Sequence, residues 1–295
     1  LGNHTLAFGG YYKDESLLDR ATNRNPLVPE FDELTRWSAA AFLEDTWSLT
    51  DRFNLTLGAR YDHDELYQGN ISPRIYGVYN FTDQFTVKGG VSTGYKQPDI
   101  RSVTDGFYSV TGGSGSPTTT GRGIIKANPD LEPESTVTSE LGFYWNNDYV
   151  NTSITGYLTQ FKDRIEEIRE CDSTGNADYN RNDVSTWKCS ENGIPFAFIS
   201  TRENIGKAEL RGVEVTFDAK LAEYTTLTAN YTFTDTEIKS GKARKTKRMY
   251  TVGEELKTND IRIQLYLETG KTVKITDYTT NADKIDMTKK LWSPR

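Results

Sequence analysis

Several segments of this chain alternate between apolar and polar or small residues, the pattern of a strand with one apolar and one polar face. In residues 53–61 the apolar positions are Phe53, Leu55, Leu57, Ala59 and Tyr61. The positions between them are Asn54, Thr56, Gly58 and Arg60. Residues 85–95 and 225–234 repeat the alternation. Each of these segments predicts a β-strand of about ten residues.

This alternation fits two architectures, a soluble β-sandwich and a transmembrane β-barrel. Aromatic residues lie near the ends of the expected strands, which is typical of an outer-membrane barrel. Only 35% of the residues are hydrophobic, yet 12% are aromatic. A barrel explains both values, because each strand needs one apolar face and tyrosines collect at the membrane interface. The predicted fold class is all-β, an antiparallel transmembrane β-barrel.

Composition and motifs disfavour several other classes of protein. No apolar run approaches the roughly 20 residues of a membrane-spanning helix. A net charge of −7 argues against nucleic acid as a partner, because binding phosphates requires clustered positive charge. Asp62 and Asp64 flank His63, but alternate residues of a strand point to opposite faces, so the three cannot converge on a metal ion. The sequence has no nucleophile motif and no zinc-ligand spacing. We therefore expect that the protein has no catalytic residue, metal site or cofactor, and that it is not an enzyme.

Cys171 and Cys189 are the two cysteines of the chain, and they lie within a polar segment. In an oxidising compartment such a pair staples a loop as a disulfide, and the alternative is two free thiols. No further cysteine or His pair accompanies them, which disfavours a metal site. We expect a Cys171–Cys189 disulfide on the extracellular side.

Short and long connections alternate along the chain, as they do in outer-membrane barrels with tight periplasmic turns and long outer loops. The expected strands are residues 3–12, 36–48, 53–63, 72–81, 85–96, 135–145, 149–162, 204–220 and 225–236. The long connections are residues 12–35, 62–71, 96–134, 163–203 and the stretch after 235. Residues 112–117 are rich in glycine, but without the Lys-Ser/Thr ending of a phosphate-binding loop they predict a flexible surface loop.

Three groups of motifs together resemble the TonB-dependent outer-membrane receptors, within the ferric-catecholate branch that includes the enterobactin and colicin I receptors. They are SPRIYGVYN (72–80) with VKGGVSTGYKQP (87–98), NPDLEPE (128–134) with ELG (140–142), and NIGKA (204–208) with RGVE (211–214). In the second group Pro129 and Pro133 cannot donate to a sheet ladder, so the strand starts after them. The resemblance covers about residues 1–241.

The resemblance implies an outer-membrane receptor for TonB-dependent uptake of a ferric siderophore, a catecholate in that branch. It also implies a barrel in contact with outer-membrane lipid, energy from TonB-ExbB-ExbD through an N-terminal plug, and docking of bacteriocins or phage. The chain contains no plug, and Leu1–His4 reads as the inside of a strand rather than as a signal peptide, so we expect its natural start upstream.

Residues 242–295 depart from the family pattern. They carry more Lys and Arg than Asp and Glu and end without a terminal aromatic residue. Ile261, Ile263 and Leu265 still alternate with polar residues. We expect a partial barrel over residues 1–241, followed by an atypical basic tail that is either further barrel strands or a non-native segment.

Ligand recognition is expected in the long loops, because strands position loops and loops carry binding. A ferric catecholate is anionic and aromatic, so its complement is Arg or Lys for charge and Tyr, Phe or Trp for stacking. Loops 96–134 and 163–203 carry many such residues. The candidate ligand-binding residues are Arg101, Tyr108, Arg122, Lys126, Arg169, Tyr179 and Trp187.

Two alternatives to a siderophore receptor remain at this stage. One is a passive porin-like channel, which needs no large loops rich in aromatic and basic residues. The other is a truncated or engineered receptor fragment without transport activity. Which siderophore is bound does not follow from the residues.

Overall fold

The computed structural model describes residues 2–18, 33–113, 122–222, 225–240, 243–245, 248–250, 255–267 and 272–273. Eleven strands of this part of the chain form one sheet in which every neighbouring pair is antiparallel. In sheet order they are β1 (His4–Leu17), β2 (Leu34–Thr50), β3 (Phe53–Asp64), β4 (Asn70–Asn80), β5 (Phe85–Lys96), β8 (Glu134–Asn146), β9 (Val150–Lys162), β14 (Lys207–Ala222), β15 (Thr225–Ile238), β18 (Glu255–Leu267) and β19 (Thr272–Val273).

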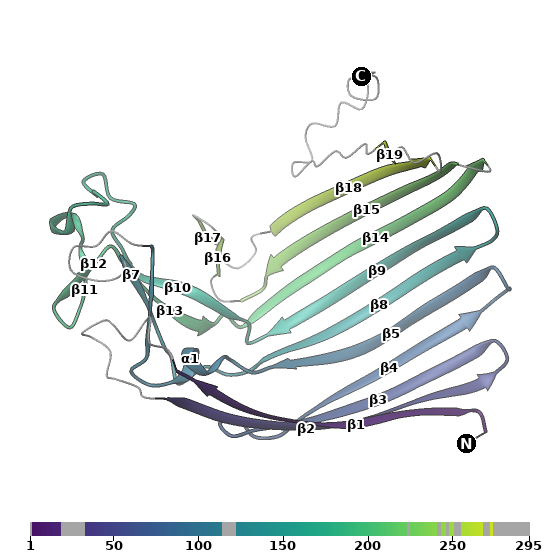
Figure 1. The fold of residues 1–295 in the computed structure, drawn as a ribbon, viewed down its shortest axis with the longest axis horizontal. Coiled ribbons are helices and arrows are strands. Elements are labelled where there is room, and N and C mark those ends of the chain that lie inside the picture. The colour runs from purple at the N-terminus through teal and green to yellow at the C-terminus, as the bar shows by residue number, and fades with distance from the viewer. Residues whose placement is uncertain are drawn as a thin grey trace.

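These strands lie side by side as one curved, open sheet, with tight turns at its right-hand end and long connections at its left-hand end (Figure 1). The predicted all-β antiparallel fold is confirmed, and each of the nine expected strands is present. None of the described helices is long and apolar enough to cross a membrane. β18 pairs with β15 and extends the sheet beyond residue 241. The domain boundary placed there stays a prediction.

Side chains of the turn residues themselves close the tight turns. Thr82 Oγ1 accepts hydrogen bonds from the backbone N–H groups of Gln84 and Phe85, at 3.2 and 3.0 Å. Asn147 Oδ1 does the same for Tyr149 and Val150, at 2.9 and 2.7 Å. Short Asn and Thr side chains favour such local bonds, which is why these sequences reverse the chain in few residues.

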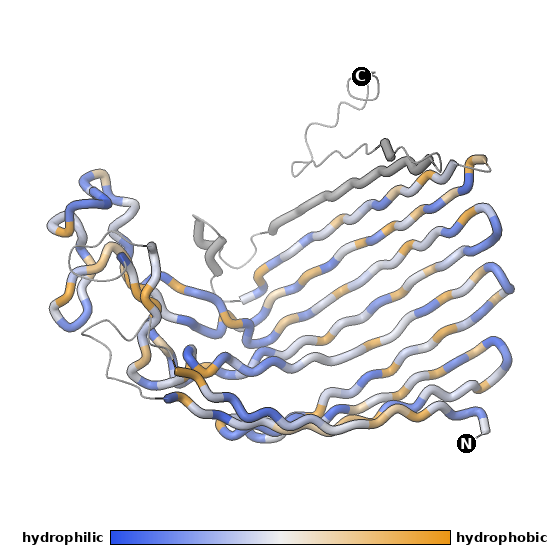
Figure 2. Tube along the Cα trace, in the orientation of Figure 1, coloured by the Kyte–Doolittle hydropathy of each residue, from blue (hydrophilic) through white to orange (hydrophobic). Residues whose placement is uncertain are grey.

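The outer face of the sheet carries the apolar half of the alternation. Cross-strand neighbours Leu57, Ile75 and Val91 lie on this face and are exposed. Hydropathy alternates along the strands in Figure 2. Aromatic contacts link Phe53, Tyr79, Phe81, Phe85 and Trp145 near the turn end. Near the loop end, Trp37 stacks with Tyr12 and contacts His63. Aromatic groups at both ends of an apolar band are typical of a membrane-facing barrel surface.

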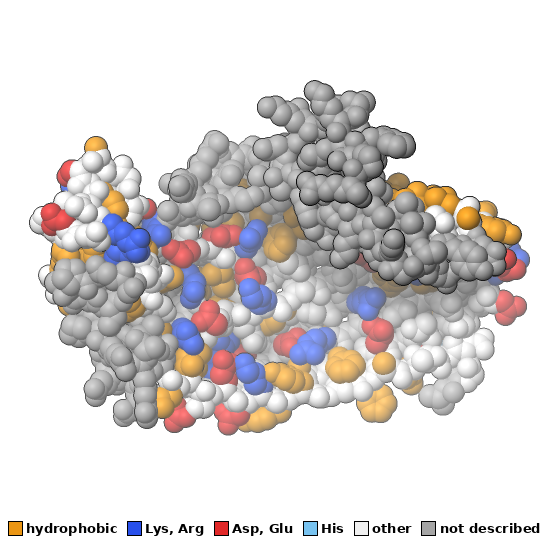
Figure 3. Space-filling model, turned by 45° about the horizontal axis from the view of Figure 1, so that its top comes forward, with side chains coloured by type: hydrophobic (Ala, Val, Ile, Leu, Met, Phe, Trp, Pro, Cys, Tyr) orange, Lys and Arg blue, Asp and Glu red, His pale blue; other side chains and the backbone are white. Residues whose placement is uncertain are grey.

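The opposite face is polar and mixed in charge. Arg60 pairs with Asp62 at 2.8 Å, and Arg74 pairs with Glu44 of a neighbouring part of the sheet at 3.2 Å. Lys88 lies 4.3 Å from the centre of the Tyr144 ring. Lys, Arg, Asp and Glu side chains gather on the hollowed face in Figure 3. This face therefore forms the polar inner wall of the partial barrel. His63 contacts Trp37, whereas Asp62 pairs with Arg60.

The long connections carry their own secondary structure. A four-stranded sheet, named the loop sheet from here on, has the order β10 (Ile165–Asp172), β13 (Phe198–Asn204), β7 (Gly123–Lys126) and β6 (Tyr108–Thr111). Shorter elements are α1 (Ile100–Val103), η1 (Val184–Thr186), β11 (Cys189–Glu191), β12 (Ile194–Phe196), β16 (Ala243–Lys245) and β17 (Arg248–Tyr250). The glycine-rich segment at 112–117 lies partly outside the described residues; Gly112 and Gly113 adopt positive φ. The strands in these long connections are too short for their periodicity to be recognised in sequence.

Register predicts how the outer and inner faces respond to charge. Ala229 pairs with Phe217 on the apolar face, whereas Thr228 pairs with Asp218 on the polar face. Replacing Ala229 with Arg near the bilayer midplane should destabilise the protein by about 2–4 kcal/mol, and Thr228→Arg should cost much less. Urea unfolding in lipid vesicles measures both variants. A larger loss at Thr228 would mean that the two faces are reversed.

Candidate ligand-binding site

The two long loops that the sequence singled out fold against each other. β7, from the loop after β5, pairs in parallel with β13, from the loop after β9, so that Gly123 lies beside Phe198 and Lys126 beside Thr201. β6 and β10 complete this loop sheet on either side. In Figure 1 the sheet lies beyond the ends of the barrel strands. The expectation that loops 96–134 and 163–203 act together thus has a structural basis.

A small apolar core and a disulfide hold the loop sheet together. Ile124, Cys189, Phe196 and Ile199 are buried against one another, and Tyr108 and Ile194 pack on them. Cys171 and Cys189 form a disulfide, as predicted. The bond joins the end of β10 to β11 across the intervening finger of residues 173–188. Loops this long retain a defined shape because they have a core of their own.

The motifs that carried the family resemblance meet in space at the rim of the barrel. Asn204 exchanges two hydrogen bonds of 2.8 Å with the backbone N–H and carbonyl of Glu132. Asn128 Nδ2 donates to the carbonyl of Arg202 at 2.9 Å. The Tyr67 hydroxyl donates to the carbonyl of Leu131, which is buried, at 2.8 Å. Neutral amide contacts therefore fix the second loop to the first.

A buried ion pair anchors the start of the first long loop. Arg36 Nη2 lies 2.9 Å from Asp64 Oδ1, and the two side chains are only 6% and 1% exposed. Arg36 Nη1 also donates to the carbonyl of Pro98 at 2.7 Å, and its guanidinium lies 5.3 Å from the centre of the Tyr67 ring. Burial raises the pKa of Tyr67 to about 12. The pair joins the rims of β2 and β3 to the chain that leaves β5.

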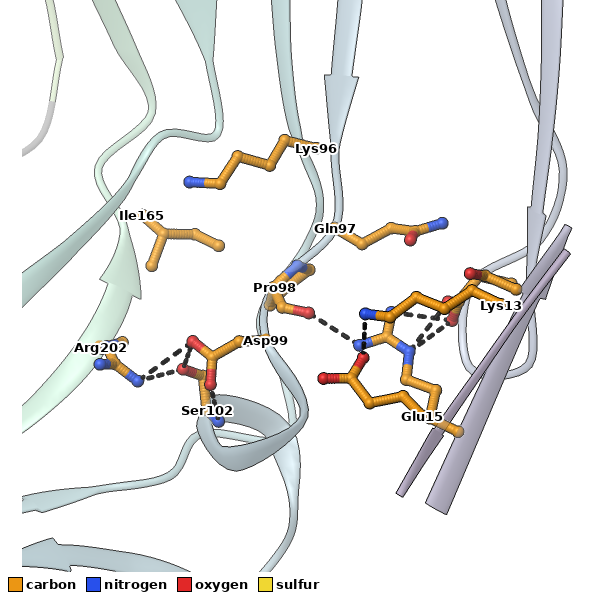
Figure 4. A pocket seen from close by; sticks show the side chains of 12 residues that line it. Lys13, Glu15, Lys96, Gln97, Pro98, Asp99, Ser102, Ile165 and Arg202 are labelled. Atoms are coloured by element: carbon orange, nitrogen blue, oxygen red, sulfur yellow. Dashed lines mark hydrogen bonds and ion pairs between the residues drawn. The ribbon is translucent and has the colours of Figure 1, made fainter. Parts of the chain in front are cut away.

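A pocket of about 410 Å³ opens beside this ion pair, at the loop end of the strands. Its wall contains charges of both signs, contributed by barrel strands and by both long loops (Figure 4). The lining residues are Lys13, Glu15, Arg36, Ser38, Asp64, Lys96, Gln97, Pro98, Asp99, Ser102, Ile165 and Arg202. A cavity of mixed charge where two loops meet above the polar inner face is the strongest candidate for contact with a ligand.

Two elements from different loops contribute the wall around Arg202. Asp99 caps α1 by accepting from the Ser102 N–H at 3.1 Å and from the Ser102 hydroxyl at 2.5 Å. Arg202 Nη1 donates to the Ser102 hydroxyl and lies 3.5 Å from Asp99 Oδ2. In Figure 4 these three side chains face one another on the left of the pocket.

Strand pairing brings the predicted residues Tyr108 and Lys126 together, and both contact acidic side chains. They pair across β6 and β7. Lys126 Nζ lies 3.1 Å from Glu170 and 3.7 Å from Glu191, and the Tyr108 hydroxyl donates to Glu191 at 3.2 Å. Burial lowers the pKa of Lys126, but its hydrogen bond to Glu170 and both carboxylates outweigh that effect and raise it. Burial, with Glu191, raises the pKa of Tyr108. The Lys126 charge is thus compensated within the loop sheet.

Arg169 lies over the ring of Phe198, and Arg122 holds the turn at Gly112. The Arg169 guanidinium is 3.5 Å from the centre of that ring, while Glu167 and Asp172 are 3.9 and 3.8 Å away, beyond hydrogen-bond distance. Arg122 donates through Nε to the carbonyl of Gly112 at 2.8 Å, and its own carbonyl accepts from Ala197. Both arginines therefore help to order the contact between the loops.

The remaining predicted residues lie apart from this group. Trp187 is only 5% exposed, and its indole N–H donates to the carbonyl of Asn180 at 3.1 Å, so it closes the finger. Tyr179 is half-buried in the same finger. Arg101 is exposed on α1, next to the pocket residue Ser102. The structure thus joins Tyr108, Lys126, Arg122 and Arg169 in the loop sheet and separates the other three.

Sequence reasoning did not single out the pocket residues that the barrel strands contribute. Lys13, Arg36 and Asp64 lie in or at the end of strands and carry ordinary strand patterns. The one sequence feature that could have pointed to them is their position near the strand ends that lead into the long loops. In the part of the chain that the structure describes, no group of three or more His, Cys, Asp and Glu side chains is placed to hold a metal ion.

Comparison with known proteins identifies the family. The family model described as TonB dependent receptor-like, beta-barrel matches residues 1–268. The chain belongs to this family. It is therefore an outer-membrane β-barrel protein, which confirms the resemblance and the location expected from the sequence.

Relatives of this TonB-dependent receptor chain include an iron-regulated outer membrane protein and siderophore receptors. It is 36% identical over 242 residues to an iron-regulated outer membrane virulence protein of Vibrio cholerae, covering 82% of this chain and 33% of the relative. It is 25% identical over 243 residues to a ferric enterobactin receptor of Pseudomonas aeruginosa, covering 78% of this chain and 31% of that protein. The chain thus spans about a third of the length of these relatives.

Solved structures of the family share the fold. A variant of the ferric enterobactin receptor PfeA of Pseudomonas aeruginosa, in complex with enterobactin, matches with a TM-score of 0.64 at 20% identity, over 90% of this chain and 37% of that chain. The siderophore receptor PirA of the same organism matches with a TM-score of 0.61 at 20% identity, over 89% and 45%. These matches support the barrel fold of this chain.

Removing the disulfide should loosen the loop sheet and leave the barrel strands intact. Because Cys171 and Cys189 are separated by 18 positions, the chain-entropy account gives about 3 kcal/mol of local stabilisation. Hydrogen exchange of the Cys171→Ser, Cys189→Ser double variant should accelerate in β10, β11 and β13. Unchanged exchange there, together with free-thiol labelling of the unreduced parent, would contradict the assignment.

The buried ion pair should be far more sensitive to substitution than an exposed one. Asp64→Ala leaves Arg36 buried without its carboxylate, which should cost about 3–5 kcal/mol. Asp62→Ala is the matched control, since its partner Arg60 is 42% exposed and exposed pairs contribute about 1 kcal/mol or less. Urea unfolding of both variants gives the two losses. Equal losses would mean that Arg36 is accessible to water.

Proposed function

We propose that this chain provides strands and two ligand-binding loops of an outer-membrane receptor for TonB-dependent uptake of a ferric siderophore, with a catecholate as the preferred class. The observation that carries the proposal is the joining of loops 96–134 and 163–203 into one loop sheet beside a charged pocket. Relatives named as ferric enterobactin receptors support the choice of catecholate.

The ligand-binding candidates divide into two groups by their contacts. Lys126, Arg169 and Trp187 use their charge or ring within the loop region, so we assign them to holding its shape. Arg101 is exposed beside the pocket, and Arg122 donates to a carbonyl rather than a carboxylate. Together with Tyr108 they supply the cations and aromatic face that an anionic, aromatic chelate requires. Tyr179 is a more distant candidate on the finger.

In this proposal the polar inner wall is the path of the chelate. Charges of both signs on Arg60, Asp62, Arg74 and Glu44 keep the wall hydrated without a single strong attraction that would trap an anion. The proposed partners are the ferric siderophore, the TonB-ExbB-ExbD complex and outer-membrane lipid. Docking of bacteriocins or phage on the exposed loops belongs to the same proposal. The role is that of a receptor, with no catalytic step.

The test is equilibrium binding of ferric enterobactin to outer membranes that carry the protein. The parent should bind the ferric complex more tightly than iron-free enterobactin, and binding should weaken as salt screens the charges. The Arg101→Ala, Tyr108→Ala, Arg122→Ala triple variant should lose about tenfold or more in affinity, since each removed charged contact contributes about 1–3 kcal/mol.

The matched control is Arg181→Ala, which removes an exposed arginine of the finger. It should bind like the parent. Unchanged affinity in the triple variant would remove these residues from the site. A parent that binds no ferric chelate in preference to the iron-free compound would remove the function, and diffusion of small solutes without saturable binding would favour the porin-like alternative.

A further inference from the structure

Arg202 is the cation of the pocket whose ionic contact is the longest. Arg36 is enclosed by Asp64 and Pro98, with the pair at 2.9 Å. Lys13 lies 2.5 Å from Glu15, and Lys96 lies 2.9 Å from Glu134. The contact between Arg202 and Asp99 measures 3.5 Å, and Asp99 is 61% exposed. A guanidinium has five N–H donors, so this contact leaves capacity for another acceptor.

Asp99 does not depend on Arg202 for its own hydrogen bonds. Its carboxylate accepts from the N–H and hydroxyl of Ser102 as the cap of α1. Exposed ion pairs of this kind are weak, about 1 kcal/mol or less. The carboxylate can therefore stay in place when the guanidinium turns toward another anion.

Separation of the two loops is not required for this rearrangement. The backbone of Arg202 is held by Asn128, whose Nδ2 donates to its carbonyl at 2.9 Å. Asn204 and Glu132 exchange two further bonds next to it. These contacts are neutral and use backbone groups. The side chain of Arg202 can move into the pocket while its backbone remains fixed to the first loop.

We propose that Arg202 binds an acidic oxygen of the ligand in this pocket, and that Asp99 is a built-in competitor that occupies Arg202 when the ligand is absent. The inference rests on the proposed function and assigns to it a pocket residue and a mechanism of selection. An anionic chelate displaces the carboxylate and gains a charge-assisted contact. A neutral or cationic chelate gains nothing from displacing it, so the pocket selects anions.

Two substitutions separate this mechanism from a structural role. Asp99→Asn keeps the α1 cap, because Asn caps helices as well as Asp does, but removes the competing charge. Arg202→Gln keeps a donor for the Ser102 hydroxyl but removes the guanidinium. Both weaken the contact between Asp99 and Arg202. If that contact only held the loops together, both variants would change ligand affinity in the same direction.

Competition requires opposite effects. Binding of ferric enterobactin to membranes that carry the protein should tighten about threefold to tenfold in Asp99→Asn and weaken about tenfold in Arg202→Gln, the range of one charge-assisted contact. The double variant should match Arg202→Gln, because a competitor has no effect once its target is gone. The affinity of Arg202→Gln should also depend less on salt than that of the parent.

Single-charge controls come from the same loops. Asp130→Asn and Arg181→Gln remove exposed charges outside the pocket and should leave affinity within about twofold of the parent. Equal shifts in the controls and the pocket variants, or losses of affinity in both pocket variants, would overturn the competition mechanism while the parent still binds. Absence of binding in the parent would instead overturn the proposed function on which it rests.

Discussion

The lipid bilayer offers no hydrogen bonds, and this constraint shapes the whole molecule. Every backbone N–H and carbonyl in the hydrocarbon region must find a partner within the protein, which restricts a strand-based chain to a continuous ladder. In the described residues, the eleven-stranded antiparallel sheet supplies these partners between its edge strands β1 and β19. Because alternate side chains then point to opposite faces, one register sets both the apolar outer surface and the polar inner wall. Thr82 and Asn147 close two of the turns with local bonds that require no distant contact.

Beyond the ladder, the loops have to stabilise themselves. Water surrounds them, so their order depends on a small core around Ile124 and Phe196, on the disulfide and on the parallel pairing of β7 with β13. The buried pair of Arg36 and Asp64 ties this region to the barrel rim. Removing one partner of such a pair is costly because the other charge remains buried. The exposed pairs of the inner wall lack that constraint, which suits the path proposed for a hydrated ligand.

The division between neutral and charged contacts connects the fold to the proposed function. Amide groups of Asn128 and Asn204 hold the two loops together whatever the state of the neighbouring charges. The guanidinium of Arg202 and the carboxylate of Asp99 lie in the pocket wall, where their contact is longer and open to solvent. A receptor that has to bind an anion tightly without losing its shape benefits from this separation.

The amino-acid sequence by itself determined the strands, their faces and the cysteine pair, because these depend on local periodicity and on there being only two cysteines. Leu57 and Val91 could be assigned to the outer face from alternation alone. Only the tertiary structure decided the loop sheet. β6 and β7 are each four residues long, and β7 also pairs with β13 of the other long loop. It also decided which charges meet. Arg36 and Asp64, or Arg202 and Asp99, are each ordinary polar residues in sequence, and folding alone brings them to within a few ångströms. A long-range contact leaves no periodic trace in a single chain, so the pocket could not be read from it.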